Sequence, residues 1–511
     1  MPSRLTALTA LGAVLLLPLT PVTAKPKAPK PCVGKAAADE WPTFGRDLVN
    51  SRHQQSPGTI GATSAPLLSP VWSYTTSGAG VGLGDLNGTP IVAAGCVFLN
   101  TAAGDVVALD AKTGAEIWRR TVTLDEGTVA GLGGIFVSSP AVTDEAVVAL
   151  VNQTTGPYAI AFGRRDGALL WRSPALKSGP GYYTNATPVV YDGLVLAGYS
   201  PAEGDPTGVG GVALVDAATG ALVTRAEVVP AADFAQGYAG GGVWTAPAID
   251  TKNGYAYAGT GNPYSKKIEH PNTNAIVKID VRRDRATFGT VVGALKGNIE
   301  QYAPVFRDLV DPACEAAGDD PNAQLIVGNS APCLQLDLDF GAPPNLFTDS
   351  SGRLLIGDLQ KSGVYHVADA TTMAPAWSAT VGLTCPACNA AASAWDRDGS
   401  IYGVSSPGTA MVSLTADTGA YQWVSPVGDG THYQSTTSAG GAVFTVDNAG
   451  HLLAFESATG APLLRRPIVA DLPAGSEPQV ALTSSGIAIA SGTLYAAVGN
   501  AVVAYRPLAL P

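Results

Sequence analysis

The sequence predicts an all-β protein, specifically an eight-bladed β-propeller of four-stranded antiparallel blades. A strand-turn unit recurs eight times along the 511 residues, and repeats of this length are typical of propellers and solenoids. Glycine (60 residues) and proline (38 residues) together outnumber the charged residues, which make up 14% of the chain, as expected for short strands joined by many turns. The sequence also lacks a long amphipathic helical pattern.

The repeat is clearest in residues 106–118, where an apolar strand ends at Asp110 and is followed by Thr113, Gly114 and Trp118. Aspartate with a downstream Thr-Gly pair forms a tight hydrogen-bonded turn in which glycine takes the positive φ. Aligned on this turn, the eight units run through Asp110, Gly163, Asp216, Asp280, Asp369, Thr415, Glu456 and Arg506. The longest interval, 89 residues between the fourth and fifth units, predicts an inserted loop.

Large side chains are needed to fill the wedges between neighbouring radial sheets, and the strand after the turn often carries tryptophan. These tryptophans are Trp118, Trp171, Trp377 and Trp423. The last unit is followed by only five residues, so we expect residues 71–74 to supply the final strand of the C-terminal blade and close the ring. A tandem of β-sandwiches is the alternative β-rich architecture.

The N-terminus has the pattern of an export signal. Residues 1–24 contain Arg4, an apolar stretch from Leu8 to Leu19 that is too short to span a bilayer, and a small-residue cleavage site ending at Ala24. Residues 25–39 begin with a Lys/Pro-rich stretch and are expected to form a linker, so that the propeller occupies residues 40–511. We therefore expect a secreted, extracytoplasmic protein with a signal peptide and no membrane span.

Charge and cysteine content are compatible with this location. The net charge of −11 and the pI of about 4.9 argue against a basic surface that binds nucleic acid. Six cysteines in an oxidising compartment predict structural disulfides. Grouping the cysteines that are close in sequence gives Cys314–Cys333 and Cys385–Cys388 and leaves Cys32–Cys96, although the sequence alone leaves the connectivity open.

Three further segments resemble the propeller of pyrroloquinoline-quinone (PQQ) dehydrogenases, the quinoprotein alcohol dehydrogenase superfamily, and within it the polyvinyl-alcohol dehydrogenase-type proteins. They are residues 40–52 (EWPTFGRDLVNSR), residues 240–244 (GGGVW) with 259–263 (GTGNP), and residues 337–343 (DLDFGAP) with 360–363 (QKSG). The repeat by itself also occurs in propellers that are not enzymes, whereas the three segments in this order are more specific. The resemblance covers most of the chain after the linker.

This resemblance implies a PQQ site. PQQ is a planar quinone with three carboxylates, so its site needs a flat apolar floor and donors or cations at its edge. Trp244 matches the position that stacks beneath the ring, Lys361 matches a cation beside the ring, and Asn185 stands where a hydroxyl donor is expected, with Thr187 nearby. Phe136 stands near the place where a carboxylate-binding arginine is common, which removes a bidentate donor.

The resemblance also implies a Ca²⁺ site and a catalytic base. Ca²⁺ takes carboxylate and amide oxygens as ligands, and Glu203, Asn262 and Asp339 match the metal-binding positions, with Asp205 as the alternative to Glu203. Asp339 also matches the base that removes the substrate's hydroxyl proton as hydride moves to the quinone. Asp337 is expected on the same side of the extended strand as Asp339.

Electrons have to leave a reduced quinone, and a fused cytochrome would carry a Cys-x-x-Cys-His haem signature. Cys385 and Cys388 have this spacing, but Asn389 replaces the histidine, so a c-type haem is not expected. The predicted partners are therefore an alcohol substrate and a separate electron acceptor such as a cytochrome.

Two functions are compatible with these features. The first is a secreted quinoprotein dehydrogenase that oxidises a secondary or polymeric alcohol by hydride transfer to PQQ with Ca²⁺ assistance. The alternative is a non-catalytic secreted propeller that binds a protein or polysaccharide. Phe136 favours this alternative, as do the turns that depart from the repeat, in which Gly163 and Arg506 replace the aspartate and Met373 replaces the glycine. The position of Glu203, Asn262 and Asp339 distinguishes them, because only the enzyme requires the three side chains to meet in one pocket.

Overall fold

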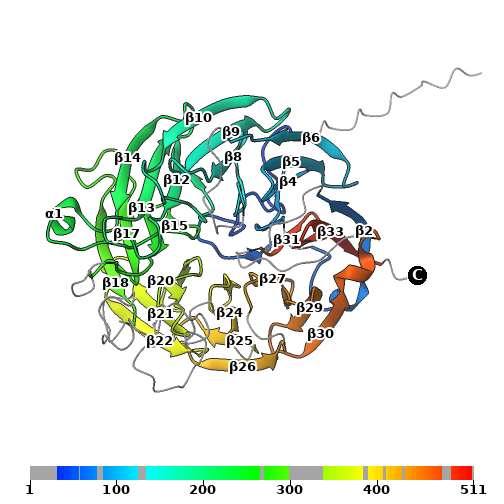
Figure 1. The fold of residues 1–511 in the computed structure, drawn as a ribbon. Helices are drawn as coiled ribbons and strands as arrows, with labels where there is room; N and C mark the ends of the chain where they lie inside the picture. The colour runs from blue at the N-terminus through cyan, green and yellow to red at the C-terminus, as the bar shows by residue number, and fades with distance from the viewer. Residues whose placement is uncertain are drawn as a thin grey trace, which may run out of the picture. The chain divides into compact units, whose positions relative to one another are not determined.

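The computed structural model describes residues 32–56, 58–76, 85–124, 134–264, 270–298, 338–383, 389–406, 410–428, 432–474 and 485–508. Within these ranges the strands form eight sheets, which surround a central axis as an eight-bladed β-propeller (Figure 1). Every blade contains four antiparallel strands, and one blade gains a fifth strand in parallel. The structure therefore confirms the predicted fold class.

The first four blades follow the chain, with the innermost strand first. Blade 1 consists of β3 (Ile91–Ala93), β4 (Cys96–Asn100), β5 (Asp105–Asp110) and β6 (Glu116–Thr121). Blade 2 consists of β7 (Ala141–Val142), β8 (Ala146–Val151), β9 (Tyr158–Gly163) and β10 (Leu169–Ala175). Blade 3 consists of β11 (Val189–Tyr191), β12 (Leu194–Tyr199), β13 (Gly211–Asp216) and β14 (Leu222–Glu227). Blade 4 consists of β15 (Ala248–Asp250), β16 (Tyr255–Gly259), β17 (Ala275–Asp280) and β18 (Val291–Lys296).

The other four blades complete the ring. Blade 5 consists of β19 (Asn345–Thr348), β20 (Leu354–Leu359), β21 (Val364–Asp369) and β22 (Pro375–Thr380). Blade 6 consists of β23 (Ala394–Trp395), β24 (Ser400–Ser405), β25 (Ala410–Thr415) and β26 (Tyr421–Pro426). Blade 7 consists of β27 (Thr437–Ala439), β28 (Ala442–Val446), β29 (His451–Glu456) and β30 (Pro462–Pro467), with β1 (His53–Gln54) added in parallel. Blade 8 consists of β31 (Ile487–Ala490), β32 (Thr493–Val498), β33 (Ala501–Pro507) and β2 (Leu68–Thr75).

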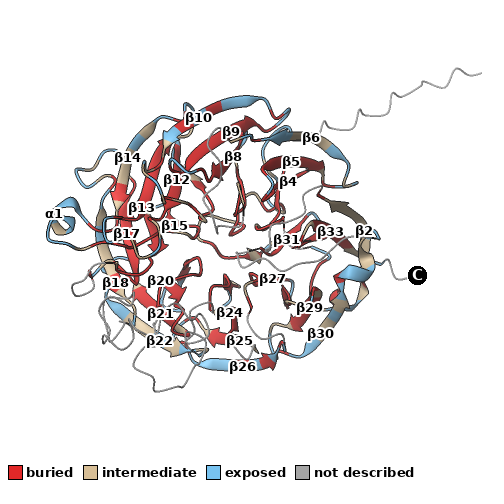
Figure 2. Cartoon of the chain, in the orientation of Figure 1, coloured by how far each residue is buried: buried red, intermediate tan, exposed pale blue. Residues whose placement is uncertain are grey.

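Helices are a minor component of the described ranges, which contain η1 (Ala65–Leu67), α1 (Ala231–Phe234) and η2 (Ile468–Asp471). None of these helices has the length and apolar character needed to cross a membrane. The inner strands of the blades are largely buried, and exposed residues concentrate on the outer strands (Figure 2). The apolar cores lie between neighbouring sheets, as in the cluster that joins strands of blades 1 and 2.

The recurring turn forms as the sequence predicts. In blade 1, Asp110 Oδ1 accepts hydrogen bonds from the backbone N–H groups of Lys112 and Thr113 and from the Thr113 hydroxyl. Gly114 then takes a φ of 73°, and its N–H donates to the Asp110 carbonyl. The third strand ends at the aligned residue in blades 1 to 7, and in blade 8 it ends one residue later.

The tryptophans pack between neighbouring blades. Trp118 Nε1 donates to the Arg164 carbonyl of the next blade at 3.0 Å, and Gly167 of that blade lies directly against its indole ring. Four other tryptophans donate in the same way to the next blade, namely Trp72, Trp171, Trp377 and Trp423. The predicted filling of the wedge is therefore confirmed, and at these five interfaces the glycine of the turn leaves room for the ring.

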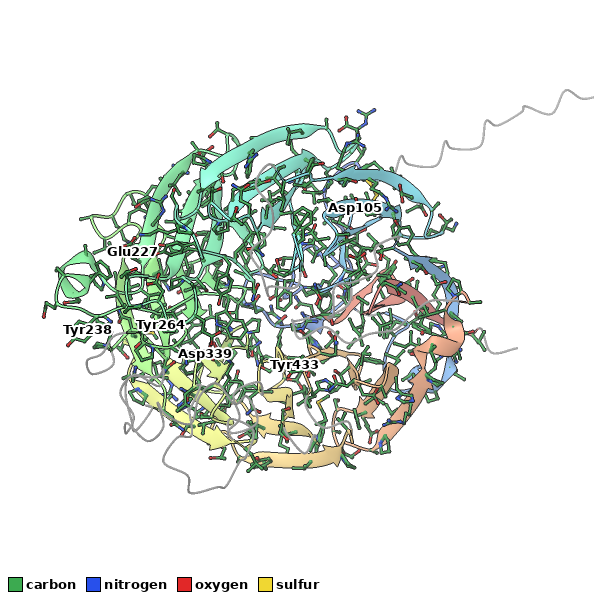
Figure 3. All side chains as sticks on the ribbon, in the orientation of Figure 1. Asp105, Glu227, Tyr238, Tyr264, Asp339 and Tyr433 are labelled. Atoms are coloured by element: carbon green, nitrogen blue, oxygen red, sulfur yellow. A yellow bond between two sulfur atoms is a disulfide. The ribbon has the colours of Figure 1, made fainter. Side chains whose placement is uncertain are left out.

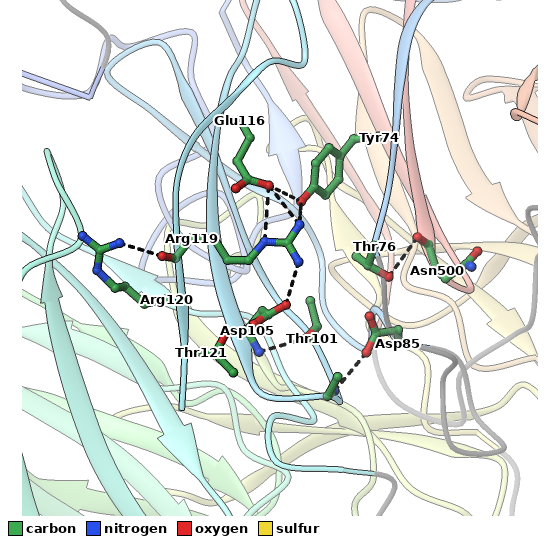
Figure 4. A network of polar contacts seen from close by, with 11 residues as sticks. Tyr74, Thr76, Asp85, Thr101, Asp105, Glu116, Arg119, Arg120, Thr121 and Asn500 are labelled. Atoms are coloured by element: carbon green, nitrogen blue, oxygen red, sulfur yellow. Dashed lines mark hydrogen bonds and ion pairs between the residues drawn. The ribbon is translucent and has the colours of Figure 1, made fainter. Parts of the chain in front are cut away.

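The ring closes by pairing of distant segments. Strand β2, which includes residues 71–74, is antiparallel to β33, as predicted. A polar network joins β2 of blade 8 to blade 1 (Figure 4): the Arg119 guanidinium donates to Tyr74 Oη at 2.6 Å, to Glu116 at 2.9 Å and to Asp105 at 2.9 Å. The first and last blades are thereby held together both by β-sheet pairing and by side chains.

The N-terminal region is fixed to blade 1 by a disulfide between Cys32 and Cys96, which confirms this predicted pair. Several predicted features lie outside the described residues: the signal peptide, residues 25–31 of the linker, Asp337, and the cysteine pairs Cys314–Cys333 and Cys385–Cys388.

Residues 40–54, here called the axial segment, contact the innermost strands of six blades. Backbone hydrogen bonds join Trp41 to β3, Leu48 to β15, Val49 to β19, and Ser51 to β23. β1 then pairs with β27, and Gln54 Nε2 donates to the Ile489 carbonyl of β31. The segment therefore binds blades that are separated by hundreds of residues in the sequence, around the axis of the propeller.

Arg52 holds this segment in place from a fully buried position. Its guanidinium donates to the carbonyls of Phe44 at 2.8 Å and Thr436 at 2.7 Å, and lies 4.8 Å from the centre of the Phe44 ring. Burial lowers the pKa of Arg52 to about 9. Several carbonyl acceptors and two aromatic rings thus compensate the lost hydration of this cation.

Candidate functional site

One cavity of ≈ 160 Å³ brings together all six predicted site residues. Its lining residues are Tyr183, Asn185, Ser200, Glu203, Gly242, Trp244, Gly261, Asn262, Tyr264, Asp339 and Lys361. The six predicted residues come from segments of blades 3, 4 and 5 that are separated by up to 176 positions, from Asn185 to Lys361. Their convergence satisfies the geometric condition that the enzyme hypothesis requires, whereas the role of each residue stays a prediction.

A run of three glycines positions Trp244. Gly240 and Gly241 have φ values of 95° and 72°, a region that strains other residues. The Gly241 N–H donates to the Asn262 carbonyl at 2.8 Å, which places the two segments side by side. A Cβ atom on Gly242 would lie 2.5 Å from Ser200 Oγ, so the chain passes too close to its neighbour for a larger residue. The run therefore brings Trp244 and Asn262 to the same cavity.

Asp339 lies at the centre of the polar contacts in this cavity. Its Oδ2 accepts a hydrogen bond from Trp244 Nε1 at 3.1 Å, and its Oδ1 forms an ion pair with Lys361 Nζ at 2.6 Å. Its backbone carbonyl accepts from the Lys361 N–H at 3.1 Å, and the next residue, Phe340, donates to the Thr260 carbonyl. The carboxylate is thus held on both sides and is largely buried, with 9% of its side chain exposed.

A buried glutamine holds the backbone beside Asp339. Gln360 Nε2 donates to the Leu338 carbonyl at 2.6 Å, and Gln360 Oε1 accepts from the Ser362 hydroxyl at 2.8 Å. His366 Nε2 lies 3.0 Å from the same Oε1, so this nitrogen carries the proton. Burial lowers the pKa of His366 to about 4, which keeps the imidazole neutral.

Glu203 reaches the cavity from the loop after β12 and is exposed. The alternative carboxylate, Asp205, does not line the cavity; its Oδ1 accepts from the N–H and hydroxyl of Thr207. Tyr183 lines the cavity together with Glu203 and Asp339. Burial raises its pKa, the nearby charges of Glu203 and Asp339 raise it further, and Lys361 opposes them. Tyr183 therefore keeps its phenolic proton and offers the cavity a hydrogen-bond donor.

A second, smaller cavity of ≈ 20 Å³ also contacts Trp244 and Asn185. Thr187 lines this smaller space and not the larger one, so Asn185 rather than Thr187 faces the predicted cofactor position. Asn185 Oδ1 is buried and accepts no hydrogen bond within the described residues. Phe44 of the axial segment also lines the smaller cavity.

Phe136, at the position of the missing arginine, is buried in the apolar core between blades 1 and 2 and lines neither cavity. Lys361 is therefore the single lysine or arginine among the described residues that line the larger cavity. The structure thus retains one of the two cations that the family pattern would place around a tricarboxylate.

The residues present are chemically suited to the groups that the resemblance implies. Glu203, Asn262 and Asp339 offer two carboxylates and an amide, which are oxygen ligands of the kind that Ca²⁺ takes. The described residues contain no cluster of three or more His, Cys, Asp or Glu side chains that could hold a metal, so a metal here would depend on the amide as well. Trp244 offers a planar face, and Lys361 offers a cation for a carboxylated quinone, with Asn185 beside them in the same cavity.

Sequence reasoning missed several residues of the site. Tyr183 lies two positions before Asn185, so the alternation of an extended strand was a signal that both face the same way. Tyr264 follows the Asn-Pro pair of the middle motif and had no separate signal. Tyr264 and Asp339, both labelled in Figure 3, line the same cavity. The pKa of Tyr433 is raised by burial and lowered by the charge of Lys361, but Tyr433 is not among the residues that line the cavity. Two tyrosines, Tyr183 and Tyr264, therefore accompany the predicted acids in the cavity.

Comparisons with known protein families agree with this architecture. The family model described as the glucose/ethanol/alcohol dehydrogenase β-propeller domain matches residues 41–270, and the model of outer membrane protein assembly factor BamB matches residues 331–509. A polyvinylalcohol dehydrogenase from Pseudomonas sp is 25% identical over 68% of this chain and 51% of that protein. A second, from Sphingopyxis sp. (strain 113P3), is 24% identical over 93% of this chain and 74% of that protein.

Solved structures share the fold at low identity. The quinohemoprotein alcohol dehydrogenase from Comamonas testosteroni has a TM-score of 0.67 and 18% identity, covering 93% of this chain and 82% of that chain. BamB from Moraxella catarrhalis has a TM-score of 0.52 and 14% identity, covering 86% of this chain and 99% of that chain. The fold alone is thus shared with enzymes and with an assembly factor, and the side chains of the cavity have to decide between such functions.

Proposed function

We propose that the chain is an exported alcohol dehydrogenase of the quinoprotein alcohol dehydrogenase-like family of β-propellers and that it uses PQQ and Ca²⁺. The observation that carries the proposal is the meeting of Glu203, Asn262, Asp339, Trp244 and Lys361 in one cavity. A propeller that only bound a protein or polysaccharide would have no need to bury an acid, a cation and an indole together. Burial of unlike polar groups at one point is typical of catalytic sites.

Within this proposal, Asp339 is the general base. PQQ polarised by Ca²⁺ would supply an acceptor for the hydride that leaves the alcohol carbon. Asp339 accepts the hydroxyl proton on its carboxylate, so the alcohol loses two electrons and two hydrogens and becomes a carbonyl compound. Trp244 holds this carboxylate through Nε1 and offers its face as the floor of the site. Glu203, Asn262 and Asp339 would hold the metal.

The polar edge of the site is formed by Lys361 and Asn185. Lys361 carries the charge that a carboxylated quinone needs, and Tyr183 adds a neutral donor in the same cavity. Asp339 and Lys361 are both largely buried, which strengthens the electrostatic contact between them. The residues of the cavity thus bind and orient the cofactor, the metal and the alcohol, and Asp339 accepts the proton.

The substrate class that we propose is a secondary or polymeric alcohol. Support comes from the two polyvinylalcohol dehydrogenases among the relatives, one of which aligns over 93% of this chain. We further propose that the protein is exported through its N-terminal signal and passes electrons to a separate acceptor such as a cytochrome, because the haem signature is incomplete.

The test is to titrate the purified mature protein with PQQ in the presence of Ca²⁺ and to measure dye-coupled oxidation of a panel of alcohols. We expect binding of PQQ, and we expect Asp339→Asn to lower the turnover number by about 100-fold or more. Asp205→Asn is the matched control, since this acid lies close to Glu203 but outside the cavity, and it should behave as the wild type. Absence of both PQQ binding and alcohol oxidation in the wild type would favour the non-catalytic alternative.

A further inference from the structure

Gln360 is fully buried and is not among the residues that line the cavity, yet its carboxamide makes an unusually complete set of hydrogen bonds. Nε2 donates to the Leu338 carbonyl at 2.6 Å and to the Asn298 carbonyl at 3.0 Å. Oε1 accepts from the Asn298 N–H at 2.9 Å, from the Ser362 hydroxyl at 2.8 Å and from His366 Nε2 at 3.0 Å. Both amide hydrogens and the carbonyl oxygen are therefore engaged.

These contacts join three segments of the chain. Leu338 precedes Asp339, so Nε2 holds the peptide group that leads into the predicted base. Asn298 follows β18 of blade 4, and a Cβ atom on its neighbour Gly297 would lie 2.7 Å from Gln360 Nε2. The amide is thus packed directly against the end of blade 4, although it belongs to the turn between β20 and β21 of blade 5. One side chain therefore ties the backbone of the predicted base to both blades.

The backbone of Lys361 is held at both of its polar atoms. Its N–H donates to the Asp339 carbonyl at 3.1 Å, and its carbonyl accepts from Asn389 Nδ2 at 3.3 Å. Asn389 is itself fully buried, donates to the Leu383 carbonyl at 2.9 Å and accepts from the Ser406 N–H at 3.1 Å. Lys361 therefore provides a fixed backbone reference for the segment that carries Asp339.

The contacts of the carboxylate depend on these backbone positions. Aspartate has a short side chain, so the place of the Asp339 carboxylate follows its main chain closely. Its Oδ2 lies 3.1 Å from Trp244 Nε1, so a shift of about 1 Å would break this hydrogen bond. A displacement of about 1 Å in a catalytic group can also lower a rate by about 100-fold. A residue that holds the peptide before Asp339 can therefore act on the reaction without touching the substrate.

We propose that Gln360 is a positioning residue for the predicted base: its two amide hydrogens hold the Asp339 segment so that the carboxylate reaches the Trp244 indole N–H. The inference rests on the proposed function, because it takes Asp339 as the base of alcohol oxidation. It requires an amide and not merely a side chain of this size. A glutamate has the same shape, but it offers at most one donor for the Leu338 and Asn298 carbonyls in place of two. The competing explanation is that Gln360 only stabilises the contact between blades 4 and 5.

The first test uses the ligand-free mature protein, with its eight tryptophans labelled with ¹⁵N for NMR spectroscopy. The indole N–H signal of Trp244 is identified as the one missing in Trp244→Phe. In Gln360→Met and Gln360→Glu we expect this signal to shift and its hydrogen exchange to accelerate by about 5-fold or more, because the hydrogen bond to Asp339 Oδ2 is lengthened or lost. Gln360→Glu keeps the packing if the methionine variant does not fold. An unchanged Trp244 signal in either folded variant would overturn the inference.

The matched control is Gln54→Met. Gln54 is also a buried glutamine whose Nε2 donates to two carbonyls, those of Asp39 at 2.9 Å and Ile489 at 2.8 Å, and it does not line the cavity. Its replacement should lower the midpoint of chemical unfolding, as the replacement of Gln360 does, and leave the Trp244 signal unchanged. Equal changes of this signal in the two methionine variants would reveal a general loss of stability and count against a positioning role.

The second test measures alcohol oxidation by the same variants with PQQ and Ca²⁺. We expect Gln360→Met to lower kcat by about 10- to 100-fold with little change in KM, because the base is displaced while the binding groups remain. Gln54→Met should keep the wild-type kcat. A wild-type kcat in Gln360→Met, together with a lower unfolding midpoint, would leave Gln360 a structural role only and refute the inference. If the wild type neither binds PQQ nor oxidises an alcohol, the proposed function fails, and the Trp244 signal still decides whether Gln360 positions Asp339.

Discussion

Replacing Asn50 by glycine tests whether the axial segment sets the geometry of the cavity. Asn50 Nδ2 donates to the Ala246 and Pro344 carbonyls, both at 3.1 Å. Ala246 lies two residues after Trp244, and Pro344 lies five residues after Asp339. One buried amide therefore joins the backbone that carries the indole to the backbone that carries the predicted base. Asn50 has a φ of 56°, so glycine preserves the backbone while removing both hydrogen bonds.

The expected loss of stability follows from the two carbonyls. Each buried acceptor that loses its donor costs about 1–3 kcal/mol, so Asn50→Gly should lower the free energy of unfolding by roughly 2–6 kcal/mol. Asn50→Ala should cost about 1 kcal/mol more, because alanine is strained at a positive φ. The difference between the two variants separates the effect of the amide from the effect of the backbone.

The assay is unfolding by guanidinium chloride, followed by tryptophan fluorescence, with Ca²⁺ and PQQ affinities measured on the same variants. Asn100→Ala is the matched control, since Asn100 is also buried and donates from Nδ2 to the Ser138 carbonyl between blades 1 and 2. We expect both variants to be destabilised and only the Asn50 variant to bind the ligands more weakly. A loss below about 0.5 kcal/mol for Asn50→Gly, or equal ligand affinities in both variants, would refute the positioning role.

Three further predictions concern the scaffold. His366 has its pKa lowered to about 4 by burial, whereas the unfolded chain takes up this proton near 6.5. The free energy of unfolding should therefore decrease as the pH falls from about 6.5 to 4, by about 3 kcal/mol in total, and His366→Asn should flatten this part of the pH profile of chemical unfolding. Trp118→Ala should cost about 3–5 kcal/mol in the same assay, because it empties a buried wedge; a loss below 1 kcal/mol would show that the wedge collapses without it. Tyr74→Phe should change stability by at most about 1 kcal/mol, since its network is partly exposed, and a larger effect that persists in high salt would contradict this assignment.

The blades could be predicted because their signal is local. The Asp110 turn and its glycine are specified within five residues, and Trp118 follows at a fixed distance. Such chemistry does not depend on distant parts of the chain, so the repeat gave the number of blades, the turn positions and the closing strand. The turn also forms in blade 5, where Met373 takes the glycine position with a φ of 60° and is buried. The surrounding packing offsets the backbone strain of a non-glycine residue at a positive φ, which the sequence alone would not predict.

The site was predictable only where a motif marked it. Trp244, Asn262 and Asp339 lie in segments that resemble a known pattern, and the structure brings them to one cavity. The contacts that orient them were not predictable, because they join residues far apart in the sequence, such as Asn50 to Pro344. Nor could the sequence show that Lys361 pairs with Asp339, because the family pattern relates Lys361 to the quinone and Asp339 to the metal and the substrate.

The interfaces between neighbouring blades, here called seams, differ on the two sides of blade 4 from most of the ring. A tryptophan of one blade donates to the next blade at five of the eight seams in the described residues. Two of the three seams without this tryptophan are those on either side of blade 4. At the first, Thr224 lies against Gly289 in place of an indole. At the second, Lys278 Nζ and Tyr257 Oη donate to the Ala370 carbonyl at 2.9 and 2.7 Å, the position that receives a tryptophan N–H elsewhere. The cavity is built from blades 3, 4 and 5, which meet at these two seams. The tryptophan contact is therefore replaced at both seams that border the cavity, where other side chains of blades 3 and 4 take over the docking position.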